Sequence, residues 1–163
     1  MSDKPINRRI PAYKKALASG EVQETYQSLV SIIQRLRTDF AKDYTGAFSV
    51  ANVLHGYIDY TYFYLQNDYL KHRKLKFAIV LNHQKATFEL WLLGRTKEVQ
   101  RVYWQKLKGV EWVNEDVMPE YSIFERDLVT HPDFDNYPGL SASIRNTFRS
   151  LSSEIFSTLE AYE

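Results

Sequence analysis

The strongest constraint on the fold is one continuous stretch, FAIVLNHQKATFELWLLG, which runs from Phe77 to Gly94. It contains two runs of mainly apolar residues, separated by the polar segment HQKA. Such runs are typical of strands, and a short polar connection joins neighbouring strands antiparallel. The stretch therefore predicts a β-hairpin, with strands over residues 75–82 and 87–93.

The number of residues in the hairpin loop decides which side chains share a face of the sheet, because side chains alternate along a strand. With an even loop, Asn82 lies opposite Thr87 and the apolar side chains separate cleanly. One face then holds Phe77, Ile79, Leu81, Phe88, Leu90 and Leu92, and the other holds Lys76, Ala78, Val80, Asn82, Thr87, Glu89 and Trp91. An odd loop mixes the two sets. We therefore predict the even loop, with Glu89 beside Trp91 on the more polar face.

Periodicity indicates the remaining elements. Apolar residues at three- and four-residue spacings predict helices over residues 21–43, 96–109 and 140–162, and a shorter helix follows Pro11 and stops near Gly20. Thr96 is the predicted N-cap of the second of these helices. The stretch NVLHGYIDYTYFYL, residues 52–65, predicts a long strand bent at Gly56, with a helix as the competing interpretation. QNDYLKHRK, residues 66–74, predicts a polar turn or one helical turn. YSIFERDLV, residues 121–129, predicts an edge strand because it carries charges.

These elements follow one another in the order α-α-β-β-β-α-β-α. Strands joined by short connections pair antiparallel, and helices pack on the apolar face of the sheet. We therefore predict an α+β fold, with a mainly antiparallel sheet of about four strands packed with helices. No linker-like segment divides the chain, so residues 1–163 are expected to form a single domain.

Composition narrows the chemistry. The chain has no cysteine, which excludes disulfides, cysteine nucleophiles and thiolate metal sites. The four histidines, His55, His72, His83 and His131, lack the spacing of a zinc site. No apolar run approaches the roughly 20 residues of a membrane helix, and no signal-type apolar segment opens the chain. We therefore expect a soluble cytoplasmic protein that does not engage a membrane, and the sequence identifies no cofactor.

Charge is divided unevenly along the chain. Residues 1–109 hold 18 Lys and Arg against 9 Asp and Glu, a net +9, whereas residues 110–163 hold 3 against 11, a net −8. Such polarity attracts partners or a second protomer, so a homo-oligomer is one expectation and solvated faces are the plain alternative. KHRKLK at residues 71–76, with Arg95, Lys97, Arg101, Lys106 and Lys108, supplies basic residues that suit nucleic acid. The acidic segment offsets them, and nucleic acid is not an expected partner.

Glu89 and Asp59 are the candidate functional carboxylates. If the odd-numbered residues of the preceding strand share a face with Glu89, a pocket forms from Asp59, His55 and Tyr57, and we favour this alternative. If the even-numbered residues do, Glu89 meets a ladder of tyrosines. The ligand-binding candidates are His55, Tyr57, Asp59, Asn82, Glu89, Trp91 and Gln100. The plain alternative is that these carboxylates accept hydrogen bonds from Tyr or Arg within the fold.

Two carboxylates on neighbouring strands also suit a divalent cation or acid–base catalysis. The element order resembles the core of the PD-(D/E)xK nuclease superfamily, in which an Asp and a (D/E)xK pair hold a metal beside a lysine. The corresponding stretch here is FELWL, with Trp91 where the motif needs lysine, and no PD precedes it. This departure places nuclease activity in doubt.

The block GYIDYTYFYL…LKFAIVLNHQKATFELWLLGRTKEVQRVYW, from Gly56 to Trp104, resembles a family of small bacterial proteins known only as a domain of unknown function. The resemblance implies a bacterial cytoplasmic origin and brings no activity to transfer. From the residues, the expected function is a binding module whose sheet face takes a small molecule or a protein partner. The alternatives are a metal-dependent, nuclease-like hydrolase that uses Asp59 and Glu89, and a self-associating interaction protein.

Overall fold

The computed structural model describes residues 3–163, and the chain forms two compact units with the boundary between Ile32 and Ile33. The first unit contains α1 (Ile6–Leu17) and the beginning of α2 (Glu21–Asp43). The second unit contains the rest of α2 and every strand of the described chain.

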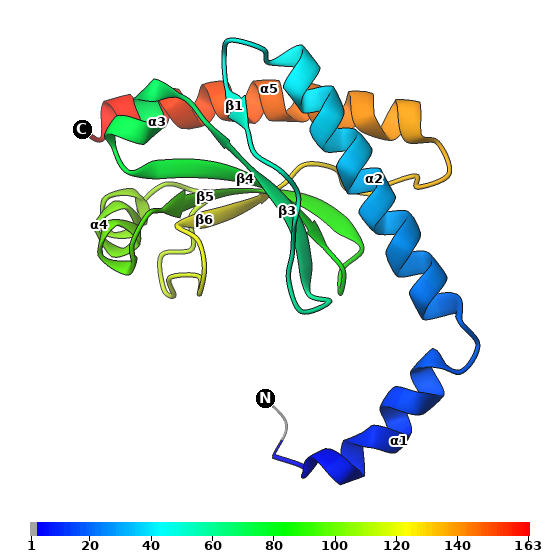
Figure 1. The fold of residues 1–163 in the computed structure, drawn as a ribbon. Helices are drawn as coiled ribbons and strands as arrows, with labels where there is room; N and C mark the ends of the chain where they lie inside the picture. The colour runs from blue at the N-terminus through cyan, green and yellow to red at the C-terminus, as the bar shows by residue number, and fades with distance from the viewer. Residues whose placement is uncertain (1–2) are drawn as a thin grey trace. The chain divides into compact units, whose positions relative to one another are not determined.

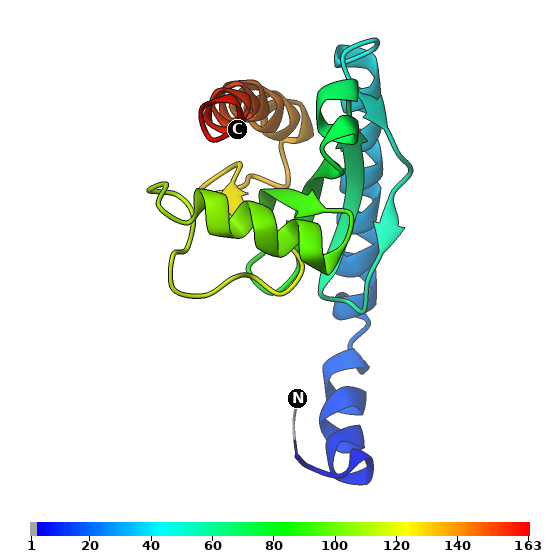
Figure 2. The ribbon, with the colours of Figure 1, turned by 90° about the vertical axis from the view of Figure 1, so that its left-hand side faces the viewer.

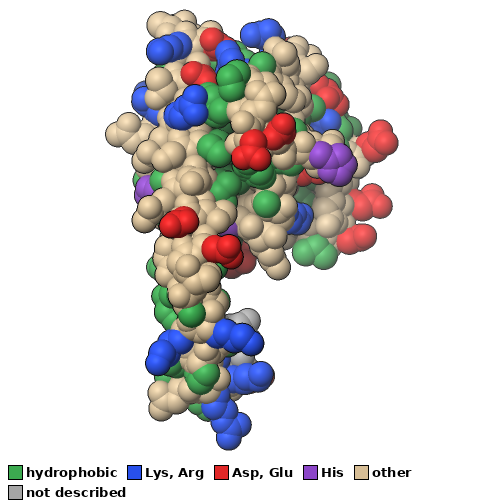
Figure 3. Space-filling view, turned by 90° about the vertical axis from the view of Figure 1, so that its right-hand side faces the viewer, with side chains coloured by type: hydrophobic (Ala, Val, Ile, Leu, Met, Phe, Trp, Pro, Cys, Tyr) green, Lys and Arg blue, Asp and Glu red, His purple; other side chains and the backbone are tan. Residues whose placement is uncertain are grey.

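Within the first unit, α1 starts five residues before Pro11, so the prediction that this helix follows Pro11 is wrong. The amide of Arg8 donates to the carbonyl of Pro5 at 3.0 Å, which closes the first turn before the proline is reached. Inside a helix, proline lacks the amide donor and its ring crowds the carbonyl four residues earlier, so Pro11 is unfavourable in α1, which nevertheless continues to Leu17. Three apolar side chains of α1 are well exposed: Ile6, Ile10 and Tyr13. Helix α1 also carries Lys14 and Lys15 in its last turn, and Figure 3 shows Lys and Arg side chains next to hydrophobic ones at its lower end.

The second unit is built on an antiparallel sheet (Figure 1). Its strands are β1 (Ser49–Val50), β2 (Leu54–His55), β3 (Tyr60–Gln66), β4 (Leu75–Asn82), β5 (Thr87–Gly94) and β6 (Phe124–Asp127). The strand order is β1-β3-β4-β5-β6, and β2 pairs separately with β3. The helices are α3 (Asp68–His72), α4 (Lys97–Leu107) and α5 (Tyr137–Ala161), besides the end of α2. The α+β class and the antiparallel sheet are confirmed, with more strands than the four predicted.

One face of the sheet forms the core with α5 and the part of α2 that follows Ile33. Phe40 of α2 packs edge-on against Phe63 of β3 at 5.6 Å and against Phe148 of α5 at 5.1 Å between ring centroids. Phe148 also meets Phe77 of β4. Figure 2 shows α5 and α4 on opposite sides of the sheet. On the face opposite α5, side chains of β3, β4 and β5 line an open cavity.

The predicted hairpin is confirmed in detail. Asn82 pairs with Thr87 and Val80 with Glu89, so the loop has the even length that the apolar pattern required. The helix over 21–43, the Thr96 cap of α4, the short turn of helix at α3 and the edge position of β6 are also as predicted.

The predicted single strand over residues 52–65 is wrong. The chain reverses between His55 and Tyr60, and β2 pairs back on β3. Gly56 sits inside this reversal, where a Cβ would lie 2.4 Å from Asp59 Oδ1 and 2.8 Å from the Tyr60 carbonyl oxygen. A residue with a side chain does not fit there without a shift, so the glycine marks a turn rather than a bend.

The reversal also changes which residues face Glu89. Tyr62 pairs with Val80, which pairs with Glu89, so these three lie in one row on one face. The preference for the odd-numbered set is therefore wrong, and the alternative of a tyrosine ladder is correct. The reason is burial: Thr61, Phe63 and Leu65 are fully buried and point into the core.

Candidate functional site

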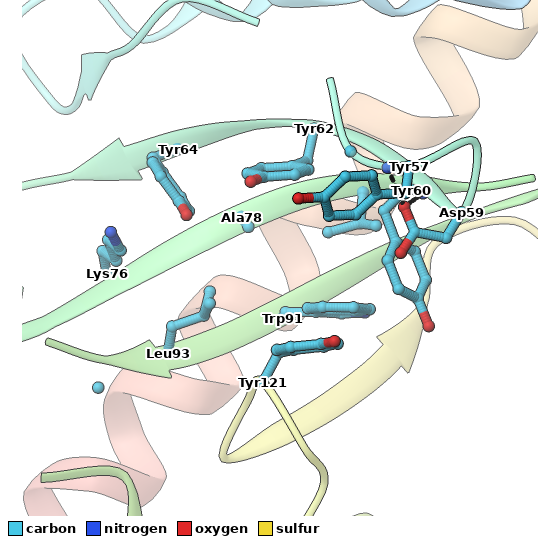
Figure 4. Close-up of a pocket in the computed structure, with 13 residues that line it drawn as sticks. Tyr57, Asp59, Tyr60, Tyr62, Tyr64, Lys76, Ala78, Trp91, Leu93 and Tyr121 are labelled. Carbon is cyan, nitrogen blue, oxygen red and sulfur yellow. Dashed lines mark hydrogen bonds between the residues drawn. The ribbon is translucent and has the colours of Figure 1, made fainter. Parts of the chain in front are cut away.

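A cavity of about 360 Å³ opens on the sheet face that points away from α5. We call it the sheet-face pocket (Figure 4). It is lined by Gly56, Tyr57, Asp59, Tyr60, Tyr62, Tyr64, Lys76, Ala78, Val80, Trp91, Leu93, Gly94 and Tyr121. Its volume falls within the range of about 300–1,000 Å³ that small-molecule sites occupy.

The floor of the pocket is apolar and rigid. Ala78, Val80 and Trp91 are buried and form one cluster, because Ala78 pairs directly with Trp91 across β4 and β5. Tyr60, Tyr62 and Tyr64 pack against this cluster from β3. The pairing brings side chains from three adjacent strands to one surface. Strand pairing, and not loop conformation, therefore fixes the floor.

The tyrosines of the lining differ in their ring contacts. Tyr60 meets Trp91 edge-on, with ring centroids 4.9 Å apart. Tyr62 and Tyr64 are tilted against each other at 5.4 Å. Burial, with a smaller contribution from the neighbouring Tyr62 hydroxyl, raises the pKa of Tyr64 to about 12. Tyr64 is therefore a neutral phenol at physiological pH and can donate a hydrogen bond inside the pocket.

Tyr121 closes one side of the pocket from a segment without regular structure. Helix α4 holds this segment, because Gln100 Nε2 donates to the carbonyls of Pro119 and Ser122, each at 2.8 Å. Trp104 Nε1 donates to the carbonyl of Asn114 at 2.8 Å in the same way. Gln100, predicted as a ligand contact, lies outside the pocket lining and positions the segment that carries Tyr121.

Glu89 lies on the same sheet face as the pocket floor but outside the lining, and it is 2% exposed. Its Oε1 accepts a hydrogen bond from Trp91 Nε1 at 2.9 Å, and its Oε2 accepts one from Asn82 Nδ2 at 3.3 Å. Asn82 Oδ1 in turn accepts from the amide of Lys85. Glu89 and Asn82 are thus engaged within the fold, and they hold the Trp91 ring and the hairpin loop in place.

Asp59 and Tyr57 line the other end of the pocket, on the turn between β2 and β3. Asp59 Oδ1 accepts from the amides of Tyr57 at 2.8 Å and Tyr60 at 2.7 Å. Tyr57 is 94% exposed, and His55 is exposed on β2. The structure therefore brings Tyr57, Asp59 and Trp91 into one lining, whereas His55, Asn82, Glu89 and Gln100 stand outside it.

Lys76 is the one cationic side chain of the lining. It is half-buried, and its ammonium lies 3.6 Å from the centroid of the Tyr64 ring. Burial lowers the pKa of Lys76. Within residues 3–163, Lys76 forms no ion pair that would offset this loss of hydration.

Negative charge collects at the opposite end. Burial raises the pKa of Glu125, and the nearby Glu89 carboxylate raises it further, against a hydrogen bond from Ser122 Oγ. Burial also raises the pKa of Tyr60, and Glu125, Glu89 and Asp59 add to the rise. In the described part of the chain, no three His, Asp or Glu side chains gather in a way that could hold a metal ion.

A family model for a domain of unknown function, DUF7000, matches residues 6–159. The chain belongs to the DUF7000 family. No curated protein and no solved structure matches the chain. The resemblance to a domain of unknown function is therefore confirmed, and it covers both α1 and the whole sheet of this DUF7000 protein. Among residues 3–163, none of the helices combines the length and apolar character needed to cross a bilayer.

Several lining residues of the DUF7000 pocket are missing from the candidates derived from the sequence. They are Gly56, Tyr60, Tyr62, Tyr64, Lys76, Ala78, Val80, Leu93, Gly94 and Tyr121. The alternation of tyrosines at 60, 62 and 64 is a sequence signal for a shared face, and it gained meaning only when the register of β3 was fixed. Tyr121 gave no such signal, because it reaches the pocket through tertiary contacts.

Proposed function

We propose that this protein is a binding module that takes a small organic molecule in the sheet-face pocket. The main support for the proposal is the lining itself, a concave surface in which five tyrosines surround an apolar floor of Ala78, Val80 and Trp91. Small-molecule sites combine a mostly apolar wall with a few placed polar groups. Here those groups are Asp59 at one end and Lys76 at the other.

The floor is well suited to a planar or apolar body. Tyr and Trp provide large contact areas with few rotatable bonds, so little conformational entropy is lost when a ligand binds. Trp91 is additionally held by its hydrogen bond to Glu89. A pocket with fixed walls needs less reorganisation on binding, which favours affinity.

A fragment screen by ligand-observed NMR, followed by backbone amide shift mapping, tests the proposal. We expect bound fragments to shift amides of β3, β4 and β5 around Tyr62, Ala78 and Trp91. Ala78→Leu fills the floor and should abolish these shifts, while Ala142→Leu, at an exposed position of α5, should leave them unchanged. Circular dichroism verifies that both variants fold. The proposal fails if no fragment binds, or if fragments bind equally well to Ala78→Leu.

Self-association is a second candidate, favoured by the exposed apolar side chains of α1. Ile6, Ile10 and Tyr13 are 63%, 41% and 65% exposed, and α1 carries Lys and Arg but no acidic residue. The acidic residues 110–163 of a second copy complement this helix in charge. Analytical ultracentrifugation at low and high salt tests this, with Ile10→Glu as the disrupting variant. A monomer at every concentration and salt level rules it out.

The metal-dependent hydrolase is not carried further, because no observation favours it. Asp59 and Glu89 each accept hydrogen bonds from within the fold. The cytoplasmic location and the bacterial origin stay predictions.

A further inference from the structure

The sheet-face pocket has one half-buried cation among its lining residues, and that cation lacks a carboxylate partner. Lys76 extends from β4 beside Leu93, with its ammonium over the Tyr64 ring. Burial removes part of the hydration of a lysine ammonium, and this is unfavourable in free energy unless an ion pair replaces the lost water. The contact with the Tyr64 ring offsets part of this cost, since a cation is attracted to the face of an aromatic ring. A negative group placed beside Lys76 would offset the remainder.

The other end of the pocket repels such a group. Asp59 lines that end, and Glu89 and Glu125 lie close enough to Tyr60 to raise its pKa. Tyr60 pairs with Asn82, six residues along β4 from Lys76, so the two ends are about 20 Å apart at the usual rise of a strand. The charges therefore distinguish the two ends of an elongated ligand.

Neutral phenols stand next to the cationic end. Tyr64 stays protonated at physiological pH, since its pKa is raised to about 12. Figure 4 shows Tyr62 and Tyr64 above Ala78, between Lys76 and the Trp91 end of the pocket. A phenol hydroxyl donates to an anionic oxygen more strongly than to a neutral one. Lys76 and Tyr64 thus supply a charge and a donor within one end of the cavity.

We propose that the pocket selects a small monoanion, an aromatic or apolar acid whose carboxylate pairs with Lys76 and whose ring lies on the Tyr62, Ala78 and Trp91 surface. The orientation follows from the charges, with the uncharged end of the ligand toward Asp59. This inference rests on the proposed binding function and specifies the class of molecule bound.

Three probes with the same two-ring body test it: 2-naphthoate, 2-naphthamide and 2-naphthylmethylamine, which are an anion, a neutral amide and a cation. Their affinities are measured by isothermal titration calorimetry with the full chain. We expect 2-naphthoate to bind at least about tenfold more tightly than the amide, because a hydrogen bond between an ammonium and a carboxylate is roughly twice as strong as one between neutral groups. The amine is expected to bind weakest.

Variants of Lys76 test whether this residue causes the preference for the anionic probe. Lys76→Met keeps most of the apolar stem but removes the charge, and it should bring the affinities for naphthoate and amide within twofold of each other. Lys76→Arg should retain the preference for the anion. Lys71→Met removes an exposed charge from α3, outside this pocket, and should change nothing.

The outcomes are separable. Equal affinity of the wild-type protein for naphthoate and amide overturns the inference, and so does a preference that survives in Lys76→Met. Stronger binding of the amine overturns it in favour of a cationic ligand at the Asp59 end. If other fragments map to the pocket but none of the three probes binds, the anion class is wrong while the binding function stands. If nothing binds at all, both fail.

Discussion

Trp91 Nε1 donates a hydrogen bond to Glu89 Oε1 at 2.9 Å, from a position two residues further along the same strand. Both side chains are buried on the face opposite the main core. Because side chains alternate along β5, residues two apart lie on the same face and can make such a contact. The carboxylate that stands out in the sequence among apolar residues is therefore the acceptor that orients the pocket's largest ring.

Removing that acceptor should cost stability. Glu89→Leu leaves the Trp91 indole N–H and the Asn82 amide without partners in a buried place, and each lost partner costs about 1–3 kcal/mol. Glu89→Gln keeps an oxygen for Trp91 and should lose less. Urea unfolding measures the difference. Equal stability of the leucine variant and the wild type would contradict the role assigned to Glu89.

Local rules predicted the parts of the fold that depend on neighbours in the chain. Alternation fixed the hairpin register, and the Thr96 cap and the apolar stripe fixed α4 and α2. The reversal at Gly56 was not predicted, because the residues around it are aromatic and β-branched and so favour a strand. In the structure, Ile58 lies in this reversal and adopts φ +62°. That conformation is unfavourable for a β-branched residue, so local preference pointed the wrong way.

The candidate site was predicted only in part, for a similar reason. Trp91 and Asp59 line the pocket as expected, but Gln100 acts on the chain 19 to 22 residues further along. Such a contact depends on how the segment from 110 to 122 folds back on α4, which no periodicity encodes. Lys76 resembled one more charge in a basic run until the sheet placed it beside Tyr64.

Strain at Ile58 gives a second prediction. A non-glycine residue in the left-handed region loses about 1–2 kcal/mol, and Ile58 is 61% exposed, so little packing compensates. Ile58→Gly should therefore leave stability unchanged or raise it by up to about 1 kcal/mol, after the entropy cost of glycine in the unfolded chain. Val117→Gly, also exposed but without a positive φ, should lower stability. Urea unfolding of both variants compares them directly.

The end of β5 allows a third prediction. A Cβ at Gly94 would lie 2.5 Å from the backbone nitrogen of Gln100, so the first turn of α4 would have to move. We expect Gly94→Ala to cost about 1–3 kcal/mol, as overpacking typically does. Gly109→Ala meets no atom within 4 Å and is the matched control. Thermal unfolding followed by circular dichroism should show a clear loss for the first variant only; equal melting temperatures would refute the close approach.

Glu125 yields a pH-dependent prediction. Its pKa is raised above the ordinary 4.5 by burial and by Glu89, so the folded state binds the proton more tightly than the unfolded state. At pH 7 the carboxylate therefore costs stability, and the cost disappears as the pH falls through the raised pKa toward 4.5. Glu125→Gln should stabilise the protein at pH 7, by less than about 1 kcal/mol because the side chain is still partly in water.

The measurement for Glu125 is urea unfolding between pH 7 and pH 4. The difference between Glu125→Gln and the wild type should shrink as the pH falls. Glu111→Gln, at an exposed position away from this cluster, is the control and should produce no such trend. A gain that stays constant across the range would mean that a property other than the charge of Glu125 is responsible.

A variant of Gln100 tests whether this residue positions the pocket wall from outside the lining. Gln100→Leu keeps most of the side-chain volume but removes the donor to the carbonyls of Pro119 and Ser122. Since Gln100 is 4% exposed, the loss should cost about 1–3 kcal/mol, and it should loosen the segment that carries Tyr121. Hydrogen exchange of the amides of residues 120–123 should accelerate while β3 and β4 stay protected. Gln105→Leu, exposed on the same helix, should alter neither rate. If the segment exchanges normally in Gln100→Leu, the wall of the pocket is held by other contacts, such as the Trp104 bond to Asn114.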